Sequence, residues 1–165
     1  IELTRNEEKD YKILFEEMPP KIEELQKRAA AFAAKYDNFD YSTEALYIHA
    51  MIPLEYADLG RSMKPPKGLS EEQEFAYYDI LEEKVYPQFA TPEELGFTRL
   101  KDLISKAKTL KRHSPAIDKA RKELNSRIPS DWPDVKKEIQ GETESVAPIP
   151  IEPVKMRMDE PEEGQ

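Results

Sequence analysis

Cysteine is absent from the 165-residue chain, and glycine occurs only five times. Without cysteine the chain has no disulfide framework, no cysteine nucleophile and no Cys-ligated zinc site. The scarcity of glycine disfavours β architectures, which depend on many tight turns. Membrane spans are not predicted, because the longest apolar run, at 45–54, is short and is interrupted by His49 and Pro53.

Sequence motifs of catalytic and metal chemistry are also missing. The chain has no Gly-rich phosphate loop and no Glu-x-x-His metal signature. His49 has Ile52 and Pro53 at the spacings where a second metal ligand would stand, so we predict a structural histidine. His113 follows a Lys-rich stretch and is predicted to interact with the dipole of a helix C-terminus. We therefore predict no catalytic residue, no metal and no cofactor.

Charge is abundant but unevenly distributed. Charged residues make up 36% of the chain, and the net charge is −9. Residues 101–127 carry nine basic and three acidic groups, whereas residues 1–100 carry twelve and 21, and residues 128–165 carry four and ten. A basic stretch thus lies between two acidic ones, which makes it the most distinctive charged surface in the sequence.

Apolar residues recur at helical spacing along most of the first 128 residues, with no strand signal. Capping boxes at Thr4–Glu7, Ser70–Gln73 and Thr91–Glu94 predict helix starts. Pro19-Pro20 is expected to end the first helix, Pro53 to kink a later one, and Gly96 to interrupt another.

The clearest amphipathic stripe predicts a helix over residues 20–36. It consists of Ile22, Leu25, Ala29, Phe32, Ala33 and Tyr36. The apolar stretch 45–54 predicts a second helix that is buried on several sides. We expect these two helices to form a hairpin, with Phe32 and Ile48 on facing stripes in its core.

The chain changes character after Trp132-Pro133. We expect residues 1–133 to form the helical domain and residues 134–165 to form an acidic, Pro-rich, extended tail. Alternate apolar residues in this tail could bind an apolar groove, namely Ile149, Ile151, Val154 and Met156. A purely solubilising tail is the other interpretation. Because the chain begins with Ile1, we expect a processed protein or part of a longer one.

Two phrases carry a family resemblance. Phe32-Ala-Ala-Lys-Tyr36, a turn at 37–43 and then Glu44-Ala-Leu-Tyr47 resemble helical pairs in tetratricopeptide-type repeats of bacterial cell-envelope proteins. Leu81-Glu-Glu-Lys-Val-Tyr-Pro87 resembles a phrase in long tetratricopeptide proteins of gliding bacteria. The resemblance spans about residues 20–133 and implies a right-handed superhelix of helix pairs, a protein-binding role without catalytic residues, and the cell envelope rather than the cytoplasm.

The sequence therefore predicts an all-α fold of stacked helical hairpins, a tetratricopeptide-like α-solenoid fragment with an extended C-terminal tail. The predicted function is a non-catalytic protein–protein interaction scaffold or structural subunit of a larger assembly. The alternatives are an enzyme with an unrecognised acid/base site and a nucleic-acid-associated subunit. The surface for an acidic partner, nucleic acid or the tail would be the basic block, defined as Lys101, Lys106, Lys108, Lys111, Arg112, Lys119, Arg121 and Lys122; a plain solvated face is the remaining interpretation.

Overall fold

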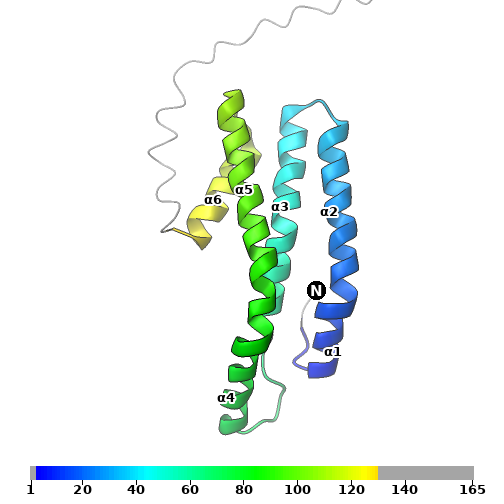
Figure 1. Cartoon of the computed structure of the whole chain (residues 1–165), viewed down its shortest axis with the longest axis vertical. Helices are drawn as coiled ribbons and strands as arrows, with labels where there is room; N and C mark the ends of the chain where they lie inside the picture. Colours follow the sequence, from blue (N-terminus) through cyan, green and yellow to red (C-terminus); the bar gives the residue numbers. More distant parts are fainter. Residues whose placement is uncertain (1–2, 130–165) are drawn as a thin grey trace, which may run out of the picture. The chain divides into compact units, whose positions relative to one another are not determined.

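The computed structural model describes residues 3–129, and every regular element in this range is helical (Figure 1). The first helical column comprises α1 (Glu7–Tyr11), the π-helical segment η1 (Lys12–Glu17) and α2 (Met18–Lys35). The second is α3 (Phe39–Arg61). The third comprises α4 (Glu71–Ile80), the π-helical η2 (Leu81–Val85), the 3-10 turn η3 (Tyr86–Phe89) and α5 (Ala90–Leu110), and α6 (Pro115–Arg127) follows it. The all-α prediction is confirmed.

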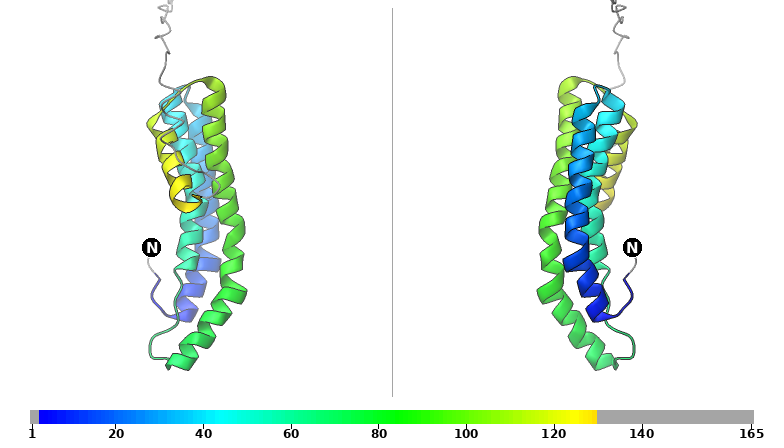
Figure 2. Two further views of the ribbon diagram at one scale, coloured as in Figure 1. Left: turned by 90° about the vertical axis from the view of Figure 1, so that its left-hand side faces the viewer. Right: turned by 90° about the vertical axis from the view of Figure 1, so that its right-hand side faces the viewer.

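Helix α3 is the centre of the arrangement. Helix α2 runs antiparallel to α3 on one side, and α5 runs antiparallel to it on the other (Figure 1). The short helix α6 packs against both α3 and α5 (Figure 2). Helix α2 makes its extensive tertiary contacts with α3, so α2 is the edge helix of this part of the chain.

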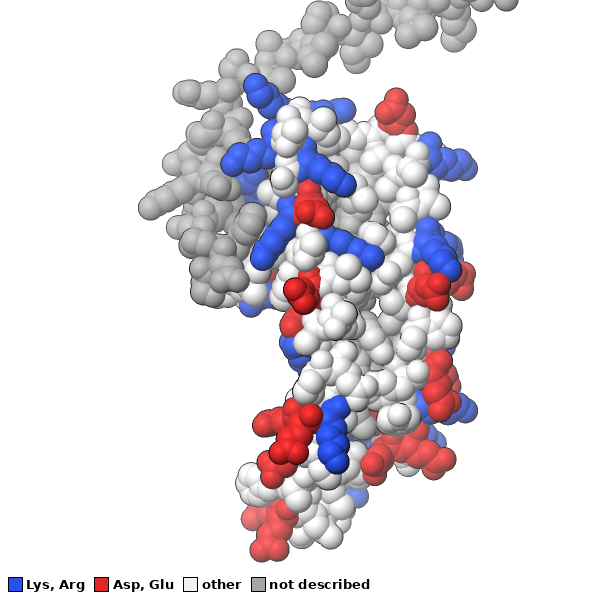
Figure 3. Space-filling model, in the orientation of Figure 1, with Lys and Arg blue, Asp and Glu red and all other residues white. Residues whose placement is uncertain are grey.

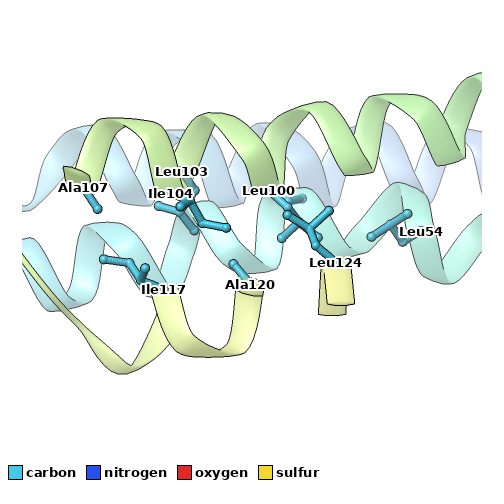
Figure 4. Packing of buried hydrophobic residues seen from close by; sticks show 9 residues of the cluster. Leu54, Leu100, Leu103, Ile104, Ala107, Ile117, Ala120 and Leu124 are labelled. Atoms are coloured by element: carbon cyan, nitrogen blue, oxygen red, sulfur yellow. The ribbon is translucent and has the colours of Figure 1, made fainter. Parts of the chain in front are cut away.

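One apolar cluster fills the space between α3, α5 and α6 (Figure 4). Its buried members are Ala50, Leu54, Leu100, Leu103, Ile104, Ala107, Ile117, Ala120 and Leu124. Complete burial of a leucine or isoleucine side chain contributes about 1.5–3 kcal/mol. This cluster is therefore the main source of stability for the α3, α5 and α6 packing.

A second cluster lies where the two π-helical segments meet the C-terminal half of α3. Its buried members are Leu14, Ala57, Met63, Leu81 and Phe89. The Phe89 ring lies against the backbone of Gly60, where a Cβ atom would overlap the ring. The close approach of η3 to α3 therefore requires a residue without a side chain at position 60, and Gly60 meets this requirement.

Gly96 does not interrupt its helix as predicted; it lies inside α5 and is buried. A Cβ atom at this position would lie 2.8 Å from Leu54 Cδ2 and 3.0 Å from the Ala50 carbonyl oxygen. The missing side chain brings the backbones of α3 and α5 together. The glycine thus serves helix packing, and the tertiary contact offsets its poor helix propensity.

Pro19-Pro20 does not end the first helix either, because the chain changes its hydrogen-bond register before reaching the prolines. In η1 the Met18 amide donates to the Ile13 carbonyl, an i→i−5 bond. The next such bond would need an amide on Pro19, which has none. The Tyr56 hydroxyl donates instead to the Leu14 carbonyl at 2.9 Å. A side chain of α3 therefore replaces the missing donor, and the helix continues.

The same device explains why α3 continues through Pro53 without a break. Pro53 lacks the amide that would bond the carbonyl of His49, four residues earlier. Arg99 of α5 donates from Nη1 to the His49 carbonyl oxygen at 3.0 Å. A buried or half-buried carbonyl without a donor would destabilise the helix, so α5 supports α3 at this point.

The capping predictions have mixed outcomes. The Ser70–Gln73 capping box is confirmed at the start of α4. The first helix is capped by Asn6, whose side chain accepts from the Lys9 amide, and not by Thr4. The Thr4 amide and hydroxyl both donate to the Asp10 carboxylate. The hydroxyl is therefore engaged with a side chain and does not cap the helix. Helix α5 begins at Ala90, one residue before the start predicted at Thr91, but it follows directly from η3 and has no side-chain cap.

Candidate protein-binding groove

Helices α2 and α3 leave an apolar groove of about 640 Å³ between them. Helix α2 contributes Met18, Ile22 and Leu25. Helix α3 contributes a longer apolar set, namely Tyr47, Ile48, Met51, Ile52, Tyr56 and Leu59. Helix α6 borders the α3 side, because its Arg127 binds Asp58 in the lining and its Lys119 lies over the Tyr47 ring. We call this feature the α2–α3 groove.

Large apolar side chains in and beside the groove are half exposed. The exposed fractions are 46% for Leu25, 48% for Ile48 and 45% for Phe32. The prediction that Phe32 and Ile48 lie in the core of the hairpin is therefore wrong. The physical reason is the edge position of α2. The apolar stripe of α2 is wider than the surface that α3 covers, so Ile22 is the one buried residue of α2.

Phe32 and Tyr36 continue the apolar strip of α2 beyond the groove. Phe32 lies seven residues after Leu25, which is close to two helical turns, so both lie on one face of α2. The Phe32 and Tyr36 rings contact each other with centroids 4.5 Å apart. From Met18 to Tyr36, the residue that follows α2, the strip covers 19 residues, or about 27 Å at the rise of an α-helix.

The groove is negatively charged. Its lining includes Glu55 and Asp58 and contains no lysine or arginine. Glu55 is exposed and forms no ion pair within residues 3–129, whereas Asp58 accepts two hydrogen bonds from Arg127 at 2.9 and 2.7 Å. The bonds that Arg127 donates to Asp58, together with Glu123, raise the pKa of Arg127. Burial raises the pKa of Tyr47, and the carboxylates of Glu123, Glu44 and Glu55 raise it further.

The predicted basic block is only partly free on the surface. Lys119 is paired with Glu44 at 2.7 Å, and the Arg112 guanidinium lies 4.2 Å from the Phe39 ring centroid. Arg121 is buried, with 4% of its surface exposed. The other five members are exposed and form no ion pair within residues 3–129: Lys101, Lys106, Lys108, Lys111 and Lys122. In Figure 3 basic side chains gather around the upper end of α5. A binding role for this block remains a prediction.

The other predicted features have simple placements. Ile149, Ile151, Val154 and Met156 lie outside the described residues, as does the whole 134–165 segment. Within residues 3–129 no three His, Asp or Glu side chains converge in a way that could hold a metal ion. In the same range no helix combines the length and the apolar character needed to cross a membrane. Burial, with a smaller effect of nearby Arg99, lowers the pKa of His49.

In comparisons with known proteins, no protein-family model, no curated protein and no solved structure matches the chain. The tetratricopeptide resemblance therefore depends on the sequence phrases alone. The α2–α3 hairpin contains the first of those phrases, from Phe32 to Tyr47. The solenoid array remains a prediction.

Sequence reasoning placed the groove residues in the core, and one signal could have corrected it. Helix α3 carries apolar side chains on nearly every side, including Ile48, Met51 and Leu54. The chain provides α2, α5 and α6 as its covering helices. A helix that is apolar all round needs neighbours on all sides. The shortage of covering helices is the signal that one side of α3 stays open within the described residues.

Proposed function

We propose that this chain is a non-catalytic protein-interaction module, a subunit of a larger assembly, that binds its partner through the α2–α3 groove. The observation that carries the proposal is the groove itself, in which Leu25 and Ile48 are each about half exposed. A contiguous exposed apolar surface with a polar border is typical of a protein-binding site. Such binding uses burial and shape and needs no reactive side chain.

The sequence resemblance supports the same class of function. Tetratricopeptide-like helix pairs act as protein-binding scaffolds, and the phrase from Phe32 to Tyr36 forms the end of the exposed strip on α2. On that resemblance the assembly would belong to the cell envelope. The exposed lysines of the basic block are the alternative surface, which would bind an acidic partner in place of the groove.

The test is a quantitative affinity capture from a native extract with the full chain as bait. Ile48→Asp and Leu25→Asp place a charge in the groove, and each should remove the specific partner, because an unpaired carboxylate in an apolar contact is costly. Both side chains are half exposed, so both variants should keep the far-UV circular dichroism of the wild type.

The matched control is Lys101→Glu, a charge change of an exposed residue in the basic block. A partner that is retained by Lys101→Glu and lost by both groove variants supports the proposal. Loss with Lys101→Glu alone would move the binding site to the basic block. Equal capture by all variants would refute binding through the groove.

A further inference from the structure

We infer that the occupant of the α2–α3 groove is a basic amphipathic α-helix of a partner protein. The inference rests on the proposed function and adds the secondary structure and charge of the partner. Its first basis is shape. The floor is formed by two antiparallel helices, and a helix fits between two others by packing its side-chain ridges into their groove. The described part of the chain has no sheet edge to which an extended peptide could add.

Side-chain chemistry also favours a helix. Apolar residues spaced three and four apart on a partner would follow Met18, Ile22 and Leu25 on α2 and Ile48, Met51 and Ile52 on α3. Met18 and Met51 are unbranched and can adapt to side chains of different shape. The strip on α2 is long enough for a helix of about 16 residues, or about 24 Å.

Charge defines the borders of that helix. Glu55 is exposed on α3 without an ion pair in the described residues, and Asp58 lies one turn further along the same helix. The two basic side chains of α6 that border the groove are already paired. Lys119 pairs with Glu44, and Arg127 pairs with Asp58 and Glu123. The groove therefore has an uncompensated negative charge. Lysine or arginine beside the apolar stripe of a partner would compensate it, whereas an acidic helix would be repelled.

A second copy of this chain suits the groove less well. In a symmetric dimer the two grooves would face each other, which would bring Glu55 and Asp58 of both chains into one interface. The net charge of −9 adds repulsion between copies.

The experiment measures the binding of three labelled peptides of about 16 residues, a length taken from the strip, to the full chain by fluorescence anisotropy. The first peptide has leucines at helical spacing flanked by lysines. The second has the same leucines flanked by glutamates. The third contains the residues of the first in scrambled order, which keeps its charge and removes its apolar stripe. We expect the lysine-flanked helix to bind about ten-fold more tightly than the glutamate-flanked helix, since each exposed ion pair contributes up to about five-fold. The preference should shrink as salt is raised.

Variants of the full chain identify the site. Glu55→Lys should reduce the preference for the lysine-flanked helix about five-fold, and Ile48→Asp should abolish binding of both helices. The matched control Glu72→Lys makes the same charge change on α4, at an exposed residue outside the groove lining, and should leave the preference unchanged.

Three results would overturn the inference. They are equal or tighter binding of the glutamate-flanked helix, equal binding of the scrambled peptide, and a wild-type dimer in sedimentation that Ile48→Asp dissociates. The last result would assign the groove to a second copy. If the native partner is lost with Ile48→Asp while the peptide preference is absent, the groove still binds protein and only its preference for a basic helix is refuted.

Discussion

Replacing Gly96 by alanine sets two known effects against each other in α5. In an open helix interior, Gly→Ala stabilises by about 1 kcal/mol, because alanine has the higher helix propensity. At Gly96 the new methyl group would lie 2.8 Å from Leu54 Cδ2 and 3.0 Å from the Ala50 carbonyl oxygen. Leu54 is fully buried, and the carbonyl belongs to the backbone of α3, so neither can move without repacking the α3–α5 contact. Overpacking of this kind costs about 1–3 kcal/mol. We therefore expect Gly96→Ala to destabilise the protein by up to about 2 kcal/mol.

The assay is urea unfolding followed by circular dichroism at 222 nm. The matched control is Thr98→Ala, two residues along the same helix at an exposed position, where only the propensity changes. Thr98→Ala should stabilise by roughly 0.5 kcal/mol, so the two alanine substitutions should have opposite signs. If Gly96→Ala is as stable as Thr98→Ala, the close approach of α3 and α5 at this position is incorrect.

Two further predictions use the same unfolding assay. Leu54→Ala should lower the free energy of unfolding by about 2–5 kcal/mol. Ile48→Ala, six residues earlier on α3 but 48% exposed, should lower it by less than about 1 kcal/mol. Similar losses of stability in the two variants would mean that the groove is closed in solution. The pKa of His49 is lowered in the folded protein, so as the pH falls the unfolded chain binds a proton at His49 before the folded chain does. The contribution of His49 to the free energy of unfolding should therefore be fully present above the ordinary pKa of 6.5 and should decrease as the pH drops below it. His49→Gln should reduce this fall, and an unchanged pH slope in His49→Gln would refute the assignment.

The helical character of this chain could be predicted from its sequence because the signals are local. Apolar spacing and the Ser70–Gln73 capping box act within a turn or two of helix, and the structure confirms both. The prolines misled the prediction for the opposite reason. The sequence predicts a helix end at Pro19-Pro20, whereas a kink is all it predicts at Pro53. Whether a helix continues past a proline depends on which group donates to the orphaned carbonyl, and the donors are distant in sequence: Tyr56 for Leu14 and Arg99 for His49. Local patterns contain no information about such donors.

The groove could not be predicted from the sequence, because the exposure of a side chain depends on which other elements pack against it. Leu54 and Ile48 have similar size and polarity and lie on one helix, yet Leu54 is fully buried and Ile48 is about half exposed. The pattern of α3 shows that both prefer burial, but only the assembled fold shows that α5 and α6 cover one side and leave the other open. The sequence predicts the requirement for burial without identifying the molecule that provides it.

Binding through the open side of α3, as proposed, would separate stability from binding within one helix. The buried cluster on α3, α5 and α6 is complete without a partner, so the fold does not depend on filling the groove. Exposing Leu25, Phe32 and Ile48 gives up about half of the burial energy that these side chains could contribute. That energy becomes available when a second molecule covers the strip, which is how a subunit can be stable alone and still bind. Selection for folding alone favours polar residues at these positions, because exposed apolar side chains promote aggregation. Under the proposed function a partner covers these side chains, which would account for an exposure that the fold itself does not require.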